Sequence, residues 1–343
     1  MNPWTWLLLA AVLALAVFWP RRGLLARWRR ARAFVARARS EDALKHILKA
    51  EANGEPSTLL SVAGALHLGQ RRTAGVLADL QRRRLLEFSG GRFKLTRAAR
   101  ELALHIIRAH RLWESYLAET TGLNETEWHR RAERQEHLLT PQQTRELEAA
   151  LGHPTSDPHG DAIPPAGAEL PAEAGQRLSD AAVGCPVTIT HVEDEPPAVY
   201  EQLTAAGLRP GVRACVLDKS AHGLRVWADG TEHFIEPLPA QNIAVAPLRA
   251  VEPRDLLGEE YLSGLRPGER ARVLGLSPAC RGPERRRLLD LGFVPGTEVA
   301  VELVSPAGDP VAYRVRGAVV ALRRNQARHI RIRREEQPLR AAA

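Results

Sequence analysis

The second half of the chain contains two copies of one pattern, and this duplication limits the possible folds more than any other feature. The first copy reads LTAAGLRPGVRACV over residues 203–216, and the second reads LLDLGFVPGTEVAV over residues 288–301. Each copy combines a short helical stretch, a glycine that can end it in left-handed geometry, a Pro-Gly turn and a strand. Short β-branched runs lie around each copy. The sequence therefore predicts two small β-barrel domains, over residues 174–250 and 256–335.

The length and charge of the chain indicate a multidomain protein with a phosphate-bearing partner. A chain of 343 residues with 44% hydrophobic content is long enough for two to four globular domains. The net charge of +8 indicates a nucleic acid or an anionic membrane surface as partner, without choosing between them. Cys185, Cys215 and Cys280 form no C-x-x-C pair, which fits structural thiols in a reducing compartment.

The N-terminus has the composition of a membrane anchor. Trp4–Trp19 is uncharged and has tryptophans at both ends, which are residues that favour bilayer interfaces. We therefore predict a transmembrane helix over residues 1–20, and the sequence around it disfavours a cleaved signal peptide. Residues 21–39 contain eight arginines and no acid, which predicts a basic amphipathic helix on anionic headgroups. A DNA-contacting basic arm is the alternative for this helix.

The charge distribution around the anchor predicts the localisation. Positive charge on one side of a membrane span marks the cytoplasmic side. We therefore expect a single-pass protein of the cytoplasmic membrane, with its C-terminal domains in the cytoplasm.

Residues 40–96 have the pattern of a winged helix-turn-helix domain. Helical periodicity predicts helices over about 41–52, 58–66 and 70–84, and the glycine-containing FSGGRF predicts a hairpin wing. In such a domain the third helix enters the major groove of DNA, while the wing meets phosphate. A winged-helix module for protein interaction is the alternative. The predicted DNA-binding residues are Gln70, Arg71, Arg72, Thr73, Arg92 and Lys94.

A helical segment follows over residues 97–152, and it carries a concentration of metal-ligand side chains. On a helix, His129, Glu133, Glu136 and His137 fall within about 100° of one another, while arginines occupy the opposite side. His110 and Glu114 stand four apart on the preceding helix. A solvated, ion-paired face is the alternative interpretation. Imidazole with carboxylate suits Mn²⁺ or Fe²⁺, as well as zinc. Residues 153–173 read as a linker.

With these pieces in order, the region over residues 40–164 resembles the diphtheria-toxin-repressor and manganese-repressor family of metal-dependent transcriptional regulators. SEDALKHIL resembles the first helix of the family, and RAHRLWESYL resembles its HR-L-x-E helix. AERQEH resembles the E/C-x-x-E-H metal motif, and GHPTSDPHGDAIP resembles a highly specific closing motif. The resemblance implies a winged helix followed by a helical metal-binding and dimerisation domain.

The resemblance also implies two metal-ligand sets. The residues that match the principal set are Asp42, Glu133, Glu136 and His137. The residues that match the second set are His110, Glu114 and His129. Lys45 stands where manganese-type members place another acid and iron-type members a basic residue. Ala198 and Val199 stand where the first barrel of the family would offer a carboxylate or an amide to the second set.

The final barrel resembles FeoA domains. The resemblance rests on LSGLRPGERARV, RRLLDLGFVPGTEV and LRRNQA. The first barrel is similar to the SH3-like domain that ends longer members of the repressor family. These resemblances imply barrels that bind segments of the regulator itself or iron-transport partners, and that do not catalyse.

The combined expectation is a multidomain α+β protein with a transmembrane helix, a winged helix-turn-helix, a helical dimerisation domain and two SH3-like or FeoA β-barrels. We predict a membrane-anchored homodimer that binds double-stranded DNA in response to Mn²⁺ or Fe²⁺ and represses metal-homeostasis genes. The metal would set the distance between two recognition helices, which must meet half-sites ~34 Å apart. The alternative is a membrane-bound accessory of a ferrous iron transporter. An enzyme is not expected, because the sequence lacks G-x-S-x-G, H-E-x-x-H and phosphate-loop motifs.

Overall fold

The computed structural model describes residues 23–335, apart from 166, 172–174, 249–251 and 259, together with five residues nearer the N-terminus (Trp4, Trp6, Val17, Trp19 and Pro20). The chain forms two compact units, which are described separately. The first unit consists of Met1–His110, Gln135–Pro141 and Pro164–Ala172. The second unit consists of Arg111–Arg134, Gln142–Ile163 and Glu173–Ala343.

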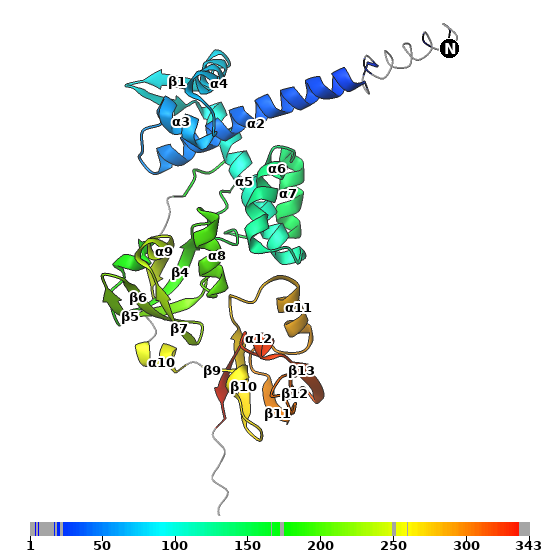
Figure 1. The fold of residues 1–343 in the computed structure, drawn as a ribbon, viewed down its shortest axis with the longest axis vertical. Coiled ribbons are helices and arrows are strands. Elements are labelled where there is room, and N and C mark those ends of the chain that lie inside the picture. The colour runs from blue at the N-terminus through cyan, green and yellow to red at the C-terminus, as the bar shows by residue number, and fades with distance from the viewer. Residues whose placement is uncertain are drawn as a thin grey trace, which may run out of the picture. The chain divides into compact units, whose positions relative to one another are not determined.

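The first unit contains a winged helix, as the sequence predicts (Figure 1). Its elements are α2 (Leu24–Ala52), α3 (Leu59–Ala65), α4 (Gln70–Arg82), β1 (Leu86–Ser89), β2 (Arg92–Leu95) and the first part of α5 (Arg97–Thr120). Thr58 caps α3, because its side chain accepts a hydrogen bond from the backbone of Ser61. The helices share one apolar core, in which Leu44, Ile47 and Leu80 are fully buried.

The wing is the tightest antiparallel hairpin in this unit. Leu86 pairs with Leu95 and Ser89 pairs with Arg92, which leaves Gly90 and Gly91 as a two-residue turn. Both glycines have positive φ, +60° and +78°. Such a turn needs two left-handed residues, and glycine adopts that backbone without steric cost.

The basic segment of residues 21–39 does not form a separate helix. Its described part continues without a break into the first helix of the winged domain, so that α2 runs over 29 residues (Figure 1). The reason is that no helix-breaking residue lies between Leu24 and Ala52, where alanine, leucine and arginine are frequent. The first half of α2 is largely exposed, including the apolar Trp28 and Val35.

The predicted transmembrane anchor over residues 1–20 falls mostly outside the described residues. Among the residues that the structure does describe, we find no helix with the length and apolar character that a membrane crossing needs. This finding contradicts the predicted single-pass location in the cytoplasmic membrane, and that prediction is withdrawn. The predicted membrane partner has no support either.

The second unit contains most of the remaining helices and both β domains. Its helical part comprises the end of α5, η1 (Glu125–Glu127), most of α6 (Trp128–Glu136) and α7 (Pro141–Ala150). The closing-motif segment over residues 152–164 has no helix or strand, and it packs against the first β domain. A Cβ at Gly160 would overlap the carbonyl oxygen of Thr190, and the amide of Val192 donates to the carbonyl of His159 at 2.9 Å.

The two β domains have the same topology, which is the structural form of the sequence repeat. The first domain contains β3 (Gln176–Arg177), η2 (Leu178–Asp180), β4 (Pro186–Val192), α8 (Pro197–Ala205), β5 (Arg213–Ser220), β6 (Gly223–Ala228), β7 (Thr231–Ile235), α9 (Pro237–Gln241) and β8 (Ile243–Pro247). A short helix, α10 (Pro253–Leu257), connects it to the second domain. The second domain contains β9 (Glu260–Tyr261), η3 (Leu262–Gly264), β10 (Arg270–Leu276), α11 (Gly282–Asp290), β11 (Glu298–Val304), β12 (Val311–Val315), β13 (Ala318–Leu322), α12 (Arg324–Ala327) and β14 (Ile330–Arg334).

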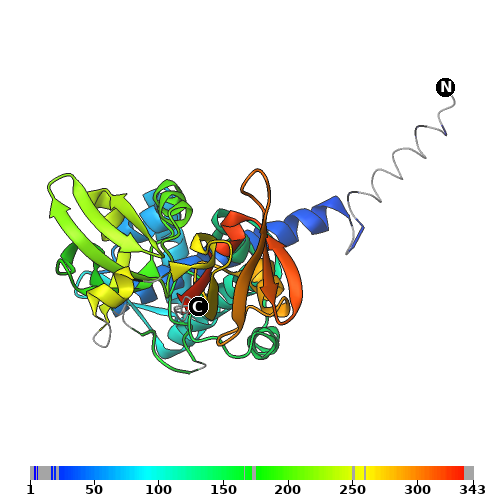
Figure 2. The same ribbon diagram turned by 90° about the horizontal axis from the view of Figure 1, so that it is seen from below.

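The strand orders show the equivalence directly. They are β3-β8-β4-β5-β6-β7 and β9-β14-β10-β11-β12-β13, so each strand of one sheet has a counterpart in the other. Equivalent bulges also interrupt β4 and β10, and β5 and β11. Bulges bend a strand, and each sheet curls around its own apolar core (Figure 2).

Candidate metal centre

The first unit contains a cluster of possible metal ligands, which we call the first cluster. Asp42 comes from α2, Glu136 is the last residue of α6, and His137 follows it. One ligand atom from each of the three residues lies within 4.8 Å of the others. The cluster therefore joins the first helix of the winged domain to the end of a helix almost 100 residues later in the chain.

Glu136 is the centre of this cluster. Its side chain is only 1% exposed, and its two carboxylate oxygens lie 3.0 and 3.1 Å from Nζ of Lys45. Nδ1 of His110 also contacts this carboxylate. Burial alone would raise the pKa of Glu136, but the charge of Lys45 and the contact with His110 outweigh it and lower the pKa to about 2. Glu136 is therefore ionised at neutral pH, as a ligand to a cation must be.

His137 is held between two carboxylates. Its Nδ1 lies 2.7 Å from Glu41 Oε2, and its Nε2 lies 3.3 Å from Asp42 Oδ1. Burial opposes protonation of this ring, but hydrogen bonds to Asp42 and Glu41 prevail and raise the pKa of His137 to about 9. Glu41 is therefore placed to orient the ring through Nδ1 while Nε2 faces the cluster.

The pKa of His137 predicts a pH dependence of metal uptake. A cation at Nε2 must displace a proton, so Mn²⁺ affinity at the first cluster should rise by up to about tenfold per pH unit between about pH 6.5 and pH 9. Without metal, the ion pairs of His137 contribute stability that is fully present below pH 6.5 and is lost as pH rises through 9. Manganese titration of the full chain across this range measures the slope. A His137→Gln variant should lose this part of the slope, and a pH-independent affinity would contradict the assignment.

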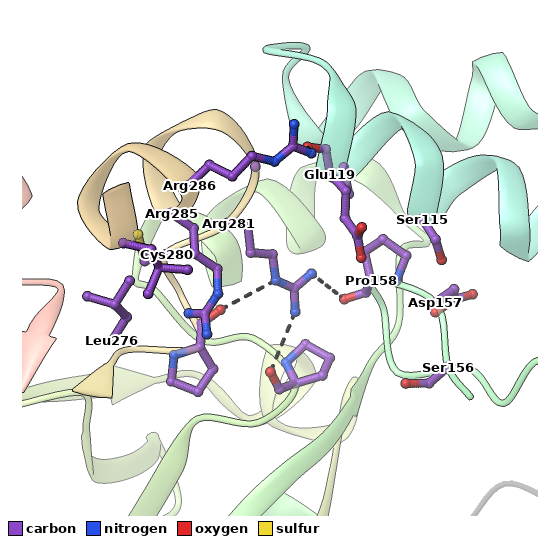
Figure 3. A pocket seen from close by; sticks show the side chains of 15 residues that line it. Ser115, Glu119, Ser156, Asp157, Pro158, Leu276, Cys280, Arg281, Arg285 and Arg286 are labelled. Carbon is purple, nitrogen blue, oxygen red and sulfur yellow. Dashed lines mark hydrogen bonds between the residues drawn. The ribbon is translucent and has the colours of Figure 1, made fainter. Parts of the chain in front are cut away.

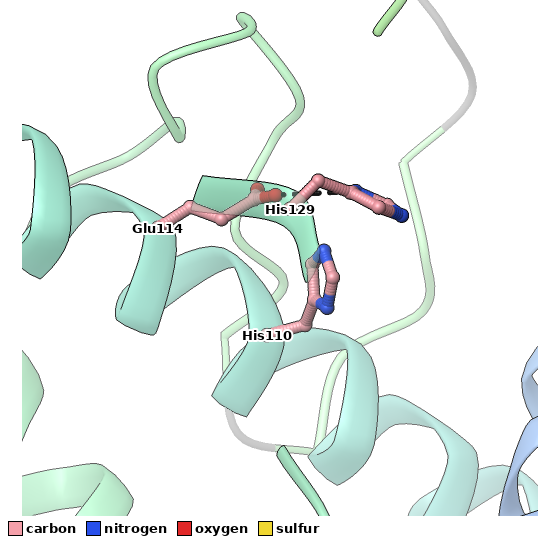
Figure 4. Close-up of side chains that lie close together, drawn as sticks. All are labelled: His110, Glu114 and His129. Atoms are coloured by element: carbon pink, nitrogen blue, oxygen red, sulfur yellow. Dashed lines mark ion pairs between the residues drawn. The ribbon is translucent and has the colours of Figure 1, made fainter. Parts of the chain in front are cut away.

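The second unit contains another group, which we call the second cluster. It consists of Glu114 on α5, His129 on α6, His159 in the 152–164 string and Asp194 after β4. His129 Nδ1 lies 2.6 Å from Asp194 Oδ2 and 3.3 Å from Glu114 Oε1. Figure 4 shows the ion pair of Glu114 and His129, and His110 on the same side of α5 as Glu114. Glu114, His159 and Asp194 offer ligand atoms within 4.8 Å of one another.

His159 gives the clearest indication that the second cluster suits a cation. The residue is only 3% exposed, and neither ring nitrogen has a hydrogen-bond partner. Its Nε2 lies 3.7 Å from Glu114 Oε1, and its ring packs edge-on against Tyr200 with 5.0 Å between centroids. Buried polar atoms rarely remain unsatisfied, so a cation at this position would supply the absent partner. Imidazole and carboxylate donors without thiolate suit Mn²⁺ or Fe²⁺.

The charges of the second cluster are strongly coupled. Burial disfavours the charged form of His129, but Asp194, Glu114 and Glu133 outweigh it and raise the pKa of His129 to about 12. The same contact lowers the pKa of Asp194, although burial acts in the opposite direction. Asp157, two residues before His159, is buried near Asp161 and Glu114, and its pKa is raised well above the ordinary value. A divalent cation would reduce the electrostatic repulsion between these carboxylates.

The two ligand sets that the sequence resemblance implies stay predictions, and the structure bears on one residue of each. Glu133, assigned to the principal set, does not belong to the first cluster. Its carboxylate is 53% exposed and lies 3.4 Å from Nε2 of His129. The residues matched to the second set, His110, Glu114 and His129, offer ligand atoms within 4.8 Å of one another, and His110 also contacts Glu136.

Three residues of the site are not among the predicted ligands, and one of them, His159, falls in the segment that the sequence analysis interprets as a linker. Glu41 could have been found as the acid next to Asp42, and His159 as the histidine of the DPHG string. Asp194 had no such signal. The barrel carboxylate was expected near Ala198 and Val199, whereas Asp194 supplies one four residues earlier.

Most predicted DNA-binding residues are exposed in the winged helix. Gln70, Arg71 and Arg72 form the exposed first turn of α4, and Arg92 and Lys94 are exposed on the wing. Thr73 is an exception, because it is fully buried and its hydroxyl donates to the carbonyl of Gly69 at 3.3 Å. This hydrogen bond to the preceding turn occupies the hydroxyl, and we therefore remove Thr73 from the predicted contacts.

Comparisons with known proteins identify two parts of the chain. Residues 96–165 match the model of the iron dependent repressor, metal binding and dimerisation domain. Residues 261–334 match the FeoA domain. A solved manganese-dependent transcriptional repressor in complex with manganese is 28% identical, with a TM-score of 0.54, and the similarity covers 61% of this chain and 100% of that one. The chain is thus similar to regulators of the diphtheria toxin repressor type over its metal-binding and dimerisation domain, and it carries a FeoA domain. The resemblance found in the sequence is thus confirmed.

Other relatives cover between about a third and three fifths of the chain. The iron-dependent repressor IdeR of Mycobacterium tuberculosis is 32% identical over 122 residues, which is 35% of this chain and 53% of IdeR. ScaR with bound Cd²⁺ is 26% identical, with a TM-score of 0.52, and covers 61% of this chain. The chain thus spans about half the length of the IdeR proteins that it matches. These relatives are repressors, which agrees indirectly with the expectation of a non-enzyme.

A third relative is a protein of a different kind. The "Probable metal transport system membrane protein" of Chlamydia trachomatis is 40% identical over 80 residues, which is 18% of that protein. A match of this extent carries no argument about transport. The comparisons therefore do not favour the alternative of a transport accessory, and the predicted transporter partner is not supported.

Proposed function

We propose that this protein is a transcriptional repressor that binds double-stranded DNA as a homodimer when Mn²⁺ or Fe²⁺ occupies its clusters. One observation carries the proposal. Asp42 belongs to the first helix of the winged domain, and it meets Glu136 and His137 from the metal-binding and dimerisation domain in one cluster. A cation bound there would tie the DNA-reading helices to the dimerisation helices, and so would favour one spacing of the two recognition helices.

The chain's own residues prepare the first cluster for this role. Asp42, Glu136 and Nε2 of His137 would hold the cation, while Glu41 orients His137 from the other side of the ring. Lys45 remains beside Glu136 and balances one negative charge. The second cluster would hold another cation with Glu114, His129, His159 and Asp194. It joins α5, α6 and the first β domain within the second unit.

The DNA-reading surface would be the first turn of α4 together with the wing. Gln70, Arg71 and Arg72 lie at the N-terminal end of α4, from which side chains of a recognition helix reach base edges. No side chain caps this helix, since Gly69 occupies the N-cap. Its first amide groups are therefore open to a phosphate. Arg92 and Lys94 on β2 would contact the backbone beside the groove.

The proposal predicts metal-dependent DNA binding that requires Arg71. The full chain should select a DNA motif in the presence of Mn²⁺ and lose it in a chelator. Arg71→Gln should weaken binding to that motif by about 1–3 kcal/mol, the usual value of a base contact. Arg82→Gln is the matched control, because Arg82 lies at the other end of α4 and pairs with Asp79. Retention of DNA that is equal with and without metal would overturn the regulatory mechanism.

A further inference from the structure

Arg281 lies at the start of α11 in the FeoA domain and contacts the loop that carries His159. We infer that Arg281 fastens the FeoA domain to this loop, so that docking of the FeoA domain and cation binding at the second cluster are energetically linked. The link to a cation rests on the proposed function, whereas the docking itself rests on the contacts of the second unit. Arg281 is thus a positioning residue.

The guanidinium of Arg281 joins three segments through their carbonyl oxygens. Its Nη1 donates to Pro158 at 2.7 Å, its Nη2 to Pro210 at 3.5 Å and its Nε to Pro278 at 3.4 Å (Figure 3). Pro158 stands between Asp157 and His159, and Pro210 belongs to the turn before β5. The shortest of the three bonds therefore ends on the residue next to a proposed ligand.

A second set of contacts brings the FeoA domain to the end of α5. Gly282, which follows Arg281, has φ of +59°, and a Cβ there would lie 2.8 Å from the carbonyl oxygen of Ala118. Arg286 reaches toward Glu119 and donates to its carbonyl at 2.8 Å (Figure 3). Ala118 lies one helical turn after Glu114. The FeoA domain therefore contacts both the helix that carries Glu114 and the loop that carries His159.

The first β domain completes the arrangement. Arg209 makes a bidentate ion pair with Glu125, just before the helix that carries His129, at 2.8–3.0 Å. Asp229 accepts hydrogen bonds from Tyr261 at 3.0 Å and Ser277 at 2.7 Å, and these two residues belong to the FeoA side. Three of the segments that supply ligands, those of Glu114, His129 and His159, are therefore held by a neighbouring β domain, and Arg281 holds the loop of His159.

The consequence is a reciprocal coupling. If the docked FeoA domain restrains the loop, then a cation at His159 favours the docked form, and the docked form raises the affinity for the cation by the same factor. A glutamine at position 281 cannot offer the three-way fork of a guanidinium. The loop would lose its contact with the FeoA domain while the ligand side chains stay unchanged.

The test compares Arg281→Gln with Arg285→Gln in the full chain. Arg285 lies on the same helix, its side chain is exposed, and the side-chain hydrogen bonds of Arg281 do not involve it. We expect Arg281→Gln to lower the affinity for Mn²⁺ at the second cluster by about tenfold, a typical allosteric coupling, and Arg285→Gln to leave it unchanged. Without metal, hydrogen exchange in residues 155–163 and 282–290 should be faster in Arg281→Gln only.

The two measurements separate the possible failures. Unchanged Mn²⁺ affinity and unchanged exchange in Arg281→Gln would overturn the inference and leave the proposed function intact. Faster exchange with unchanged affinity would show docking without coupling, and would also overturn the inference. Absence of Mn²⁺ uptake by the unsubstituted chain would overturn the proposed function, and the cation link with it, while the exchange measured without metal would still report on the docking.

Discussion

Glu136→Gln is expected to abolish Mn²⁺ uptake at the first cluster and to lower the free energy of unfolding by about 3–5 kcal/mol, the usual result of breaking a buried ion pair. The reason is that the side chain of Glu136 is 1% exposed and its carboxylate contacts both Lys45 and His110. An amide removes the charge that a cation needs, and it removes the buried carboxylate that Lys45 contacts. Chemical denaturation and manganese titration of the full chain measure the two effects.

The double variant Lys45→Met/Glu136→Gln separates these effects. Removing the ammonium together with the carboxylate should restore most of the lost stability, because no charge remains unpaired. Uptake of Mn²⁺ at the first cluster should stay absent. The matched control is Glu133→Gln, three residues earlier on α6, where the side chain is 53% exposed. Loss of uptake in Glu133→Gln, with normal uptake in Glu136→Gln, would contradict the first cluster.

Gly160→Ala is expected to destabilise the second unit by about 3 kcal/mol or more. Single substitutions reach such values when they strain the backbone or cause a steric overlap. Gly160 has φ of +96°, a conformation that alanine rarely adopts, and the added Cβ would overlap the carbonyl oxygen of Thr190. That oxygen belongs to the backbone of β4 and cannot rotate away. The loop of His159 would have to leave β4, which would separate His159 from Asp194 and weaken the second cluster.

Gly152→Ala is the control for Gly160→Ala. Gly152 also has positive φ, +73°, but a Cβ there would meet nothing within 4 Å. The backbone strain alone should cost about 1–2 kcal/mol, and Mn²⁺ uptake should be unchanged. Thermal unfolding and metal titration of both variants separate backbone strain from displacement of the loop. Equal effects of the two substitutions would contradict the importance of the contact with Thr190.

Local patterns in the sequence predict much of this protein, because they depend on neighbours along the chain. The repeat of residues 203–216 and 288–301 predicts two related β domains, and their strand orders and bulges agree. The two-glycine turn predicts the wing, and the helical spacing of acids and imidazoles predicts metal ligands on α5 and α6. The sequence does not predict that α2 is continuous. The change from basic to mixed composition near Ser40 suggests a boundary between two helices, whereas the helix continues through this position.

Local sequence features indicate most of the proposed metal ligands and the helices that carry them, since helix period and turn chemistry are local properties. How these side chains are grouped depends on packing between distant segments. Glu133 and Glu136 lie less than one turn apart on α6, yet one contacts His129 and the other Lys45 and His110. Asp194 reaches His129 because β4 packs against Gly160, a contact between distant segments that close packing produces and that no local pattern encodes.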